Sequence, residues 1–306
     1  MPELPEVQTI VDELKKKIIG KKITDVWVDP VKPVKTGHGA SWPKIKKEII
    51  NKKILNIRRR AKYIIMDIEG KKTLFVHQKI SGHLLYGKWA RKSQIANRKS
   101  QIDSNQEWIS IIPGPLRDDS RNGYIRLIFF LSNGYQLGLS DLRRFAKVIL
   151  VDDDKVNELE EIRRLGPEPL EINFNQFLNL FKKKRGKIKP ILMDPTFIAG
   201  IGNIYSDEIL WDAGYHPISR VENLKEKDIK NIFSSMVKIL KKAIKYQGDS
   251  IDDYRLPSGE KGRYQEVQKA YHQTKKLCSR KDGGTIARLK VGGRSAHFCP
   301  KHQKLV

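Results

Sequence analysis

The first predicted element is a helix, because apolar residues near the start of the chain recur at helical spacing. Between positions 5 and 19 they lie three or four positions apart, at Val7, Ile10, Val11, Leu14 and Ile18. This spacing places them on one face of a helix, opposite the run KKK at 15–17. The pattern predicts an amphipathic helix over residues 5–19.

The next stretch, from 22 to 150, has the pattern of short β-strands. Its apolar runs are separated by glycine, asparagine and aspartate, and they read ITDVWVD, KILNIRRR, KYIIMDI, TLFVHQKI, GYIRLIFFL, YQLGLSDL and AKVILVD. We therefore predict an antiparallel β-sandwich or barrel. A polar stretch from 88 to 122, interrupted by WISII, predicts a long loop or partly ordered insertion, to which we assign no function.

Helical spacing returns beyond position 158. It is found in NFNQFLNLFKKK, around IGNIYSDEILWDAG and in LKEKDIKNIFSSMVKILKKAIKYQG. The tail from 277 contains TIARLKV, KVGGRS and HFCPKH, which predict a β-hairpin clamped at its base. We expect an α+β multidomain protein, with an N-terminal helix and β-sandwich over 1–150, a helical domain over 151–265 and a hairpin over 266–306.

Charge narrows the class of partner but not the activity. Lys and Arg number 60 against 35 Asp and Glu, so the formal net charge is +25. A field of this size attracts polyanions such as nucleic acid. A ribosome-associated protein, or a genome whose base composition favours lysine codons, would explain the same charge.

The cysteines and the apolar runs bear on the compartment. Both cysteines lie near the C-terminus, which excludes a disulfide-stapled secreted scaffold. The start MPELPEVQTI has neither a basic n-region nor an apolar h-region. No apolar run reaches the roughly eighteen residues of a membrane span. We therefore expect a cytoplasmic protein that does not span the membrane.

Candidate chemistry begins at Pro2. Proline is small enough for the initiator methionine to be removed, which would leave a free secondary amine. The α-amino group, whose ordinary pKa is about 8, retains an unprotonated fraction at neutral pH, so it can act as a nucleophile. Attack on the anomeric carbon of deoxyribose would give a positively charged iminium, an electron sink for both base loss and β-elimination.

Two carboxylates accompany this amine. Glu3 could protonate the opened sugar or the leaving group, and Glu6, one helical turn further, could orient the amine. An ordinary helix start explains the same residues, since Pro in the first turn and Glu near the positive end of the helix dipole both favour a helix. Local pattern alone leaves both interpretations open.

The segment MPELPEVQTI resembles the start of the formamidopyrimidine-DNA glycosylase and endonuclease VIII family, and similar segments follow in order over nearly the whole chain. The resemblance implies that Pro2 is the nucleophile and that Glu3 and Glu6 are its carboxylates. RRRAKYIIMDI is similar to the family segment whose lysine lies beside the amine. This assigns to Lys62 a contact with phosphate or a part in proton transfer.

Two further segments resemble loops that fill the hole left by an extruded nucleotide. HQKISGHL is similar to the family's HLGMSGxL, and SDLRRFAKV is similar to DPRRFGxV. The resemblance implies that Ile80 fills the void, that Phe145 is the wedge, that Arg143 reads the orphaned base and that Arg144 holds phosphate. For Ile80 and Phe145, plain core packing is the alternative.

The block ILMDPTFIAGIGNIYSDEILWDAGYHP resembles the family's helix-two-turn-helix, whose signature is AGIGNIYADE. Gly200 and Gly202 permit a tight turn and close backbone approach, and Asn203 could donate hydrogen bonds to phosphates at a helix N-terminus. A helix hairpin with glycine caps is the alternative. QGDSIDDYRLPSGEKGRYQ resembles the loop that closes over the extruded base, near Ser250 to Tyr254, and favours an oxidised purine.

The tail resembles a zinc-held β-hairpin with two CxxC pairs, and Arg294 matches the family arginine that reaches phosphates on both sides of the lesion. Lys281 stands where the second cysteine belongs, and an ammonium is a poor zinc ligand, so Asp282 is a candidate oxygen donor. A hairpin held by packing alone, without zinc, is the alternative. Three residues match the other zinc ligands: Cys278, Cys299 and His302.

The resemblance implies a bifunctional DNA glycosylase and AP lyase of base excision repair. It would remove 8-oxoguanine and formamidopyrimidines through a Pro2 Schiff base and cleave the strand by β,δ-elimination. The expected partner is double-stranded DNA with oxidised bases or abasic sites, a monomer suffices, and one zinc ion is the expected cofactor, with no organic cofactor. The alternatives are an endonuclease VIII-like enzyme for oxidised pyrimidines and a damaged-DNA-binding relative without catalysis. Three residues of the two hole-filling loops differ from the family pattern: Gln78, Lys79 and Ala146. These differences leave open which base the protein prefers opposite the lesion.

Overall fold

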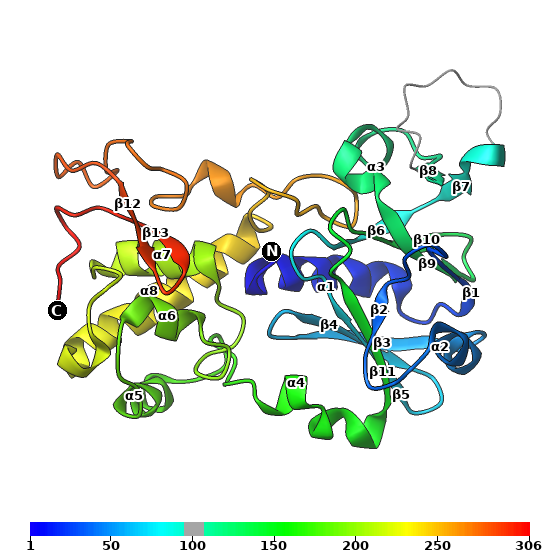
Figure 1. The fold of residues 1–306 in the computed structure, drawn as a ribbon, viewed down its shortest axis with the longest axis horizontal. Coiled ribbons are helices and arrows are strands. Elements are labelled where there is room, and N and C mark those ends of the chain that lie inside the picture. Colours follow the sequence, from blue (N-terminus) through cyan, green and yellow to red (C-terminus); the bar gives the residue numbers. More distant parts are fainter. Residues whose placement is uncertain (95–106) are drawn as a thin grey trace. The chain divides into compact units, whose positions relative to one another are not determined.

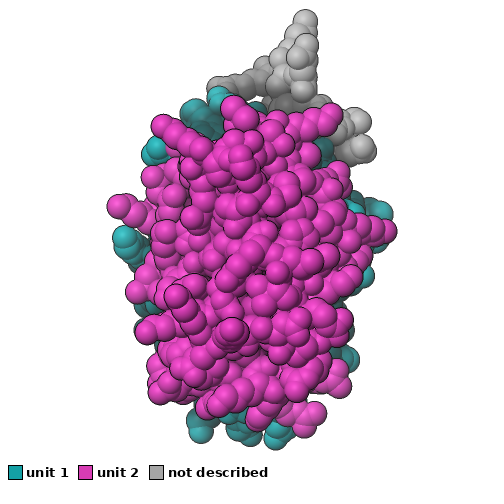
Figure 2. Space-filling model, turned by 90° about the vertical axis from the view of Figure 1, so that its left-hand side faces the viewer, with its two compact units in different colours: residues 1–2, 6–159, 247–263 teal, residues 3–5, 160–246, 264–306 magenta. Residues whose placement is uncertain are grey.

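A computed structural model describes residues 1–94 and 107–306 of the chain. Its contacts define two compact units, which Figure 2 distinguishes by colour. Unit 1 comprises residues 1–2, 6–159 and 247–263. Unit 2 comprises residues 3–5, 160–246 and 264–306. This division differs from the three predicted ranges, because residues 247–263 belong to the β-rich unit and the C-terminal hairpin belongs to the helical unit.

The N-terminal segment forms the predicted helix. α1 spans Leu4–Ile18 (Figure 1). Its basic residues lie in the last turn, where positive charge is favourable to the helix dipole. The five apolar residues predicted to share a face are all fully buried: Val7, Ile10, Val11, Leu14 and Ile18.

Unit 1 contains two sheets whose strands come from the predicted β-rich stretch. The first has the antiparallel order β1-β9-β10-β6, with β1 at Ile23–Val28, β9 at Ile125–Leu131, β10 at Gln136–Ser140 and β6 at His83–Gly87. The second has the order β2-β11-β5-β4-β3, with β2 at Lys35–Thr36, β11 at Lys147–Asp152, β5 at Lys72–His77, β4 at Tyr63–Ile68 and β3 at Ile54–Arg60. Only β2 and β11 pair in parallel within these sheets.

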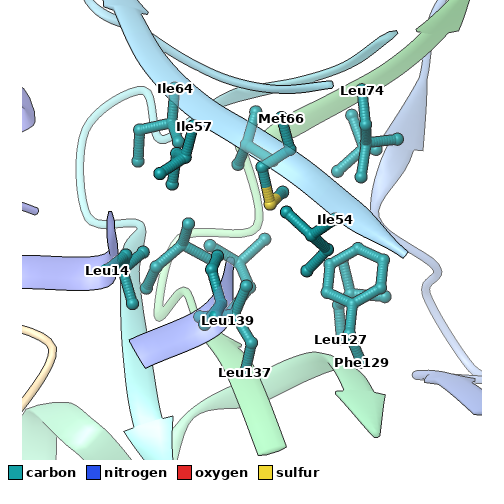
Figure 3. Close-up of a cluster of buried hydrophobic side chains, with 14 of the residues drawn as sticks. Leu14, Ile54, Ile57, Ile64, Met66, Leu74, Leu127, Phe129, Leu137 and Leu139 are labelled. Atoms are coloured by element: carbon teal, nitrogen blue, oxygen red, sulfur yellow. The ribbon is translucent and has the colours of Figure 1, made fainter. Parts of the chain in front are cut away.

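The core of unit 1 lies where the two sheets and α1 face one another. Figure 3 shows Leu139 and Leu127 of the first sheet facing Met66 and Ile54 of the second, with Leu14 of α1 on the side of Leu139. All are buried in one cluster. Burying a side chain of this size contributes roughly 1.5–3 kcal/mol, so the cluster stabilises the predicted sandwich.

The described residues of the polar stretch from 88 to 122 form short elements, as the predicted partly ordered insertion requires and a long loop does not. β7 (Trp89–Arg91) pairs with β8 (Trp108–Ser110), and a short helix, α3 (Pro115–Asp118), follows before the 3₁₀ turn η2 (Ser120–Gly123). Residues 95–106 lie outside the described part. The segment folds because its own apolar residues pack on the outer face of the first sheet; the buried members are Trp89, Trp108, Leu116, Leu85, Ile125 and Ile128.

Three other short elements of unit 1 were not predicted. α2 spans Trp42–Ile49, has Pro43 in its first turn and buries Trp42, Ile45 and Ile49. Its three apolar positions are too few to reveal a helix in the sequence. Two 3₁₀ turns, η1 (Lys92–Gln94) and η3 (Asp153–Glu158), complete the described elements of unit 1.

Unit 2 is helical and ends in the predicted hairpin. A capping box of Asn173 and Gln176 starts α5. Among the described residues, no helix is long and apolar enough to cross a bilayer. The elements are α4 (Glu160–Arg163), α5 (Phe174–Lys182), α6 (Ile188–Met193), α7 (Asn203–Ala213), η4 (Val221–Asn223), α8 (Glu226–Lys245), η5 (Tyr264–Glu266), β12 (Ala287–Val291) and β13 (Arg294–Phe298).

Candidate active site

Glu3 caps the N-terminus of α7 in unit 2. Its Oε2 accepts hydrogen bonds from the backbone N–H groups of Gly202 at 2.6 Å and Tyr205 at 3.4 Å, and its Oε1 accepts from Ile204 at 2.9 Å. The side chain is only 2% exposed. Free N–H groups and the helix dipole attract a carboxylate to this position. The carboxylate therefore caps a helix that is distant in sequence.

Glycine is required where the N-terminal segment meets the turn before α7. Leu4 N–H donates to Gly200 O at 3.0 Å. A Cβ at Gly202 would lie 2.5 Å from Glu3 Cδ, and one at Gly200 would lie 2.8 Å from Leu4 Cβ. Gly200 also has φ +89°, a left-handed conformation that disfavours other residues. The two glycines therefore allow residues 3 and 4 to approach this turn closely.

Pro2 and Glu6 belong to unit 1. Pro2 is buried and directly precedes Glu3 and α1. Glu6 is also buried, and its Oε1 accepts a hydrogen bond from Asp249 N at 2.8 Å. A Cβ on Gly248 would lie 2.7 Å from the same oxygen. Glu6 thus joins the first turn of α1 to the segment 247–263.

Lys62 lies in the turn between β3 and β4, next to Ala61, whose φ is +51°. Tyr63 pairs with His77 across β4 and β5, and their rings are 4.6 Å apart. Burial, together with the positive charges of Lys79 and Lys62, lowers the pKa of His77 to about 3. Its Nδ1 accepts from Lys79 N at 2.9 Å, so the neutral ring carries its proton on Nε2. His77 is the first residue of HQKISGHL, and its position in that segment is the one feature of the sequence that points to it.

The two predicted hole-filling loops are joined in unit 1 by Ser81. Its Oγ donates to Asp141 Oδ1 at 2.5 Å and accepts from Arg143 N at 2.9 Å. The other carboxylate oxygen of Asp141 accepts from Ala146 N at 2.8 Å. Ile80, next to Ser81, is half-buried. The structure therefore brings Ile80 and the loop of Arg143 together.

Phe145 is not a core residue. Its side chain is 41% exposed, unlike that of its buried neighbour Ala146. The guanidinium of Arg143 and the ammonium of Lys35 lie 5.4 and 5.8 Å from the ring centroid. An exposed aromatic ring flanked by cations is suited to contact with stacked bases and phosphate. Core packing is excluded as the explanation for Phe145.

Arg144 makes contacts within its own unit. Its Nη1 lies 2.9 Å from Asp29 Oδ2 and 3.4 Å from Lys32 O, and its φ is +58°. Asp29 is buried and also pairs with Arg126 at 3.1 Å. In this structure Arg144 anchors the base of the wedge loop, and its predicted contact with phosphate stays a prediction.

Ser250 and Tyr254 form hydrogen bonds inside the segment 247–263 and so fix its conformation. Ser250 Oγ donates to Tyr254 O at 2.8 Å and accepts from Gly262 N at 2.9 Å. Tyr254 O–H donates to Glu6 O at 3.4 Å, and burial with the nearby charge of Glu6 raises the pKa of Tyr254 well above its usual value. Both side chains are buried, whereas Ile251 between them is exposed. Ile251 and Asp252 are thus exposed between the two buried side chains, and the N–H of Ile251 donates to Asp249 Oδ1 at 3.1 Å.

Asn203 and Arg294 are placed in unit 2 by a buried ionic network. Asn203 begins α7, and its Oδ1 is buried without a hydrogen-bond partner among the described residues. Arg294 is exposed at the start of β13. Asp207 of α7 accepts from both the backbone N–H and Nδ1 of His297 in β13, each at 2.9 Å, and pairs with buried Lys189. Asp207 thereby fixes the hairpin of Arg294 to the helix of Asn203.

Four side chains at the base of the hairpin could hold a metal ion. The ligand atoms of Cys278, Asp282, Cys299 and His302 all lie within 4.8 Å of one another. Tetrahedral zinc places its ligand atoms about 3.3–3.8 Å apart. Sγ of Cys278 is 3.4 Å from His302 Nδ1, and Sγ of Cys299 is 3.5 Å from Asp282 Oδ2. Both distances fall within this range, whereas His302 Nδ1 and Asp282 Oδ2 lie 2.9 Å apart, as a hydrogen-bonded pair, and would have to separate slightly to bind the same ion.

The surroundings of this cluster also fit a metal. His302 Nε2 lies 3.1 Å from Trp211 O, so the ring can donate there and turn the lone pair of Nδ1 toward the cluster. The backbone N–H of Gly284 lowers the pKa of Asp282 to about 2, which keeps the carboxylate charged. Lys281 is exposed and is not part of the cluster.

Solved structures share this fold. The complex between the Lactococcus lactis Fpg and abasic-site-containing DNA matches with a TM-score of 0.80 and 31% identity, covering 99% of each chain. The complex of the same organism's protein with Fapy-dG-containing DNA matches with a TM-score of 0.78 and 31% identity, covering 99% of this chain and 100% of the other.

Sequence comparisons assign the family. A model of the formamidopyrimidine-DNA glycosylase N-terminal domain matches residues 1–148, and a model of the formamidopyrimidine-DNA glycosylase H2TH domain matches residues 165–255. Formamidopyrimidine-DNA glycosylase of Pelotomaculum thermopropionicum is 35% identical, with 100% of both chains covered. That of Lactococcus lactis subsp. lactis is 34% identical over 98% of each chain. The chain belongs to the formamidopyrimidine-DNA glycosylase family.

Proposed function

We propose that this chain removes oxidised purines from double-stranded DNA and then cleaves the strand at the abasic site. Membership of the family makes it a DNA glycosylase of base excision repair. The observation that carries the mechanism is that buried Pro2 directly precedes Glu3, while Glu3 and Glu6 are both buried and held by backbone N–H groups. The purine substrate is supported by the Lactococcus lactis complex with Fapy-dG-containing DNA.

The proposed reaction begins when removal of Met1 frees the amine of Pro2. The nitrogen lone pair attacks C1′ of the damaged nucleotide, the base leaves with the electrons of its glycosidic bond, and the base takes up the proton that the amine loses. Glu3 protonates the ring oxygen as the sugar opens, which leaves an iminium between Pro2 and C1′. Glu6 orients the amine through its fixed position on the first turn of α1.

Strand cleavage follows from the same iminium. Loss of a proton from C2′ moves an electron pair toward the iminium, and the 3′ phosphate leaves in β-elimination. A second elimination releases the 5′ phosphate. Hydrolysis then frees Pro2 from the sugar fragment. The amine is thus the one nucleophile for both base loss and strand cleavage.

The remaining predicted residues are proposed to hold the DNA. Lys62, Arg144, Asn203 and Arg294 would contact backbone phosphates, because cations and helix N-terminal groups are the usual phosphate ligands in proteins. Ile80 and Phe145 would fill the space of the extruded nucleotide, with Arg143 reading the orphaned base. Ser250 to Tyr254 would contact the extruded base through backbone amides.

Zinc is proposed as the ion held by Cys278, Asp282, Cys299 and His302. When bound, zinc would cross-link the ends of the hairpin segment and so stabilise the fold that carries Arg294. Asp282 would replace the second cysteine of the usual set. We further propose that the protein acts as a monomer in the cytoplasm, on the nucleoid when bound to DNA, since its substrate is chromosomal DNA.

Reductive trapping tests the proposal. Borohydride should convert the iminium of the wild-type protein with a duplex containing 8-oxoguanine into a stable covalent complex, and peptide mapping should place the adduct on Pro2. Pro2→Gly should bind the same duplex yet trap far less. Full activity in a preparation that mass spectrometry shows to retain Met1 would exclude Pro2 as the nucleophile.

A panel of lesion duplexes tests the choice of substrate. Formamidopyrimidines and 8-oxoguanine should be excised faster than oxidised pyrimidines. Preference for oxidised pyrimidines would instead indicate endonuclease VIII-like specificity, and binding without trapping on any lesion would indicate a relative that only binds damaged DNA.

A further inference from the structure

The segment 247–263 carries a buried arginine that is paired with the end of the 88–122 stretch. Arg255 Nε donates to Asp119 Oδ2 at 2.6 Å. Nη1 of the same guanidinium donates to Asp252 O at 3.1 Å and to Tyr254 O at 2.7 Å. Both partners belong to unit 1. Arg255 therefore fixes the curve of its own segment and fastens it to Asp119.

Two further contacts join the same two parts of unit 1, and a third joins the segment to β6. Arg121 Nη1 lies 2.9 Å from Asp253 Oδ1. Buried Asn122 donates from Nδ2 to Gly259 O at 3.0 Å, and its Oδ1 lies 3.1 Å from His83 Nε2. Elsewhere on the segment, Pro257 O accepts from the backbone N–H of Tyr86 at 2.8 Å. The segment is thus attached to the rest of unit 1 at two neighbouring places, residues 253–255 and residues 257–259.

The two ion pairs differ in strength. Side chains of Arg255 and Asp119 are 5% and 22% exposed, whereas those of Arg121 and Asp253 are 42% and 17% exposed. Breaking a buried pair leaves an uncompensated charge and is costly, while an exposed pair is screened by solvent. The pair of Arg255 with Asp119 should therefore contribute more than the pair of Arg121 with Asp253.

We propose that Asp119, Arg121 and Asn122 are positioning residues that hold the segment 247–263 ordered before DNA binds, so that Ile251 and Asp252 are presented to the extruded base. This rests on the proposed function of the segment as the loop that closes over the base. Ordering a loop costs conformational entropy. If the loop is already ordered in the free protein, base capture does not bear that cost.

Hydrogen exchange in the DNA-free protein tests the order of the segment. Backbone amides of residues 250–262 should exchange at least about tenfold faster in Asp119→Asn than in the wild-type protein. In Arg121→Gln the increase should be smaller. Arg117→Gln is the matched control, because Arg117 lies in the same stretch and pairs with exposed Asp118, not with the segment. The proposal is overturned if 250–262 exchange as fast in wild type as in Asp119→Asn.

Single-turnover kinetics test the consequence for catalysis. Excision of 8-oxoguanine should slow at least about tenfold in Asp119→Asn, and strand cleavage at a preformed abasic site should stay near the wild-type rate, because an abasic site has no base to capture. Equal loss of both activities would contradict a positioning role and indicate general damage to the fold. Arg121→Gln provides a milder variant should Asp119→Asn fold poorly.

Failure of this inference is distinguishable from failure of the proposed function. A wild-type protein that traps DNA through Pro2, but whose segment exchanges freely, would retain the glycosylase function and lose only the positioning residues. A wild-type protein that neither traps nor cleaves abasic DNA would overturn the function itself, whatever the order of the segment.

Discussion

The two carboxylates near Pro2 have different backbone partners. Glu3 accepts from the first N–H groups of α7, and Glu6 accepts from Asp249 at the start of the segment 247–263. Each carboxylate therefore fixes a part of the chain that is distant in sequence, in addition to its proposed chemistry. Substitution of either would change both geometry and proton transfer, so loss of activity in a Glu3 or Glu6 variant does not by itself identify a proton donor.

Phe145 offers a cleaner test of a single residue. Because its ring is 41% exposed, Phe145→Ala should change the free energy of unfolding by less than about 0.5 kcal/mol. Loss of the wedge should weaken binding of a lesion duplex by about 1–3 kcal/mol, the usual contribution of one aromatic stacking contact. Leu142→Ala is the control, since Leu142 is 38% exposed in the same loop. Equal weakening in both variants would exclude a specific role for the ring.

His83 predicts a dependence of stability on pH. Burial lowers its pKa from 6.5 to about 4, so between these values the unfolded chain binds a proton that the folded chain does not. Stability should therefore fall as pH falls from 6.5 to 4, by up to about 1.4 kcal/mol per pH unit from this group. Urea unfolding at several pH values should show that the free energy of unfolding falls less per pH unit in His83→Gln than in the wild-type protein. An unchanged slope would show that His83 is not the titrating group.

Among the elements, those with long and regular patterns were predicted and short ones were missed. Five buried positions define α1, and the strands of unit 1 have apolar runs bounded by turn residues. The strand β8, by contrast, is three residues long, and α2 is eight residues long and rich in lysine. Such short elements form because other parts of the fold pack against them. Their own residues do not show which parts these are, so local patterns do not predict the elements.

The C-terminal hairpin gives a prediction at the scale of an element. Asp282→Ala should lower zinc affinity at least about tenfold, because it removes one of four donors from the cluster. Thermal unfolding of unit 2 should then occur at lower temperature and should no longer respond to a chelator. Lys281→Ala is the adjacent control and should retain zinc in elemental analysis. Equal zinc content in both variants would contradict Asp282 as a ligand.

The excess of positive charge acts on the scale of the whole molecule. With a net charge of +25, binding to DNA should weaken steeply with salt, with a log–log slope of about −3 or steeper if Lys62, Arg144 and Arg294 each neutralise a phosphate. Arg294→Gln should reduce the slope by about one. Single-turnover cleavage of already bound DNA should depend on salt far less. A salt-independent dissociation constant would refute the proposed DNA interface.

The sequence by itself determined the family, the sandwich and the helix-two-turn-helix, because each is encoded in local spacing or in a contiguous motif, and it also named Pro2 as the candidate nucleophile. Only the tertiary structure decided that Glu3 caps α7, that the candidate donor Asp282 lies close to Cys278, Cys299 and His302, and that Asp119 pairs with Arg255. These contacts join residues far apart in the chain. Side-chain partners across such separations depend on how the elements pack, which no local pattern specifies.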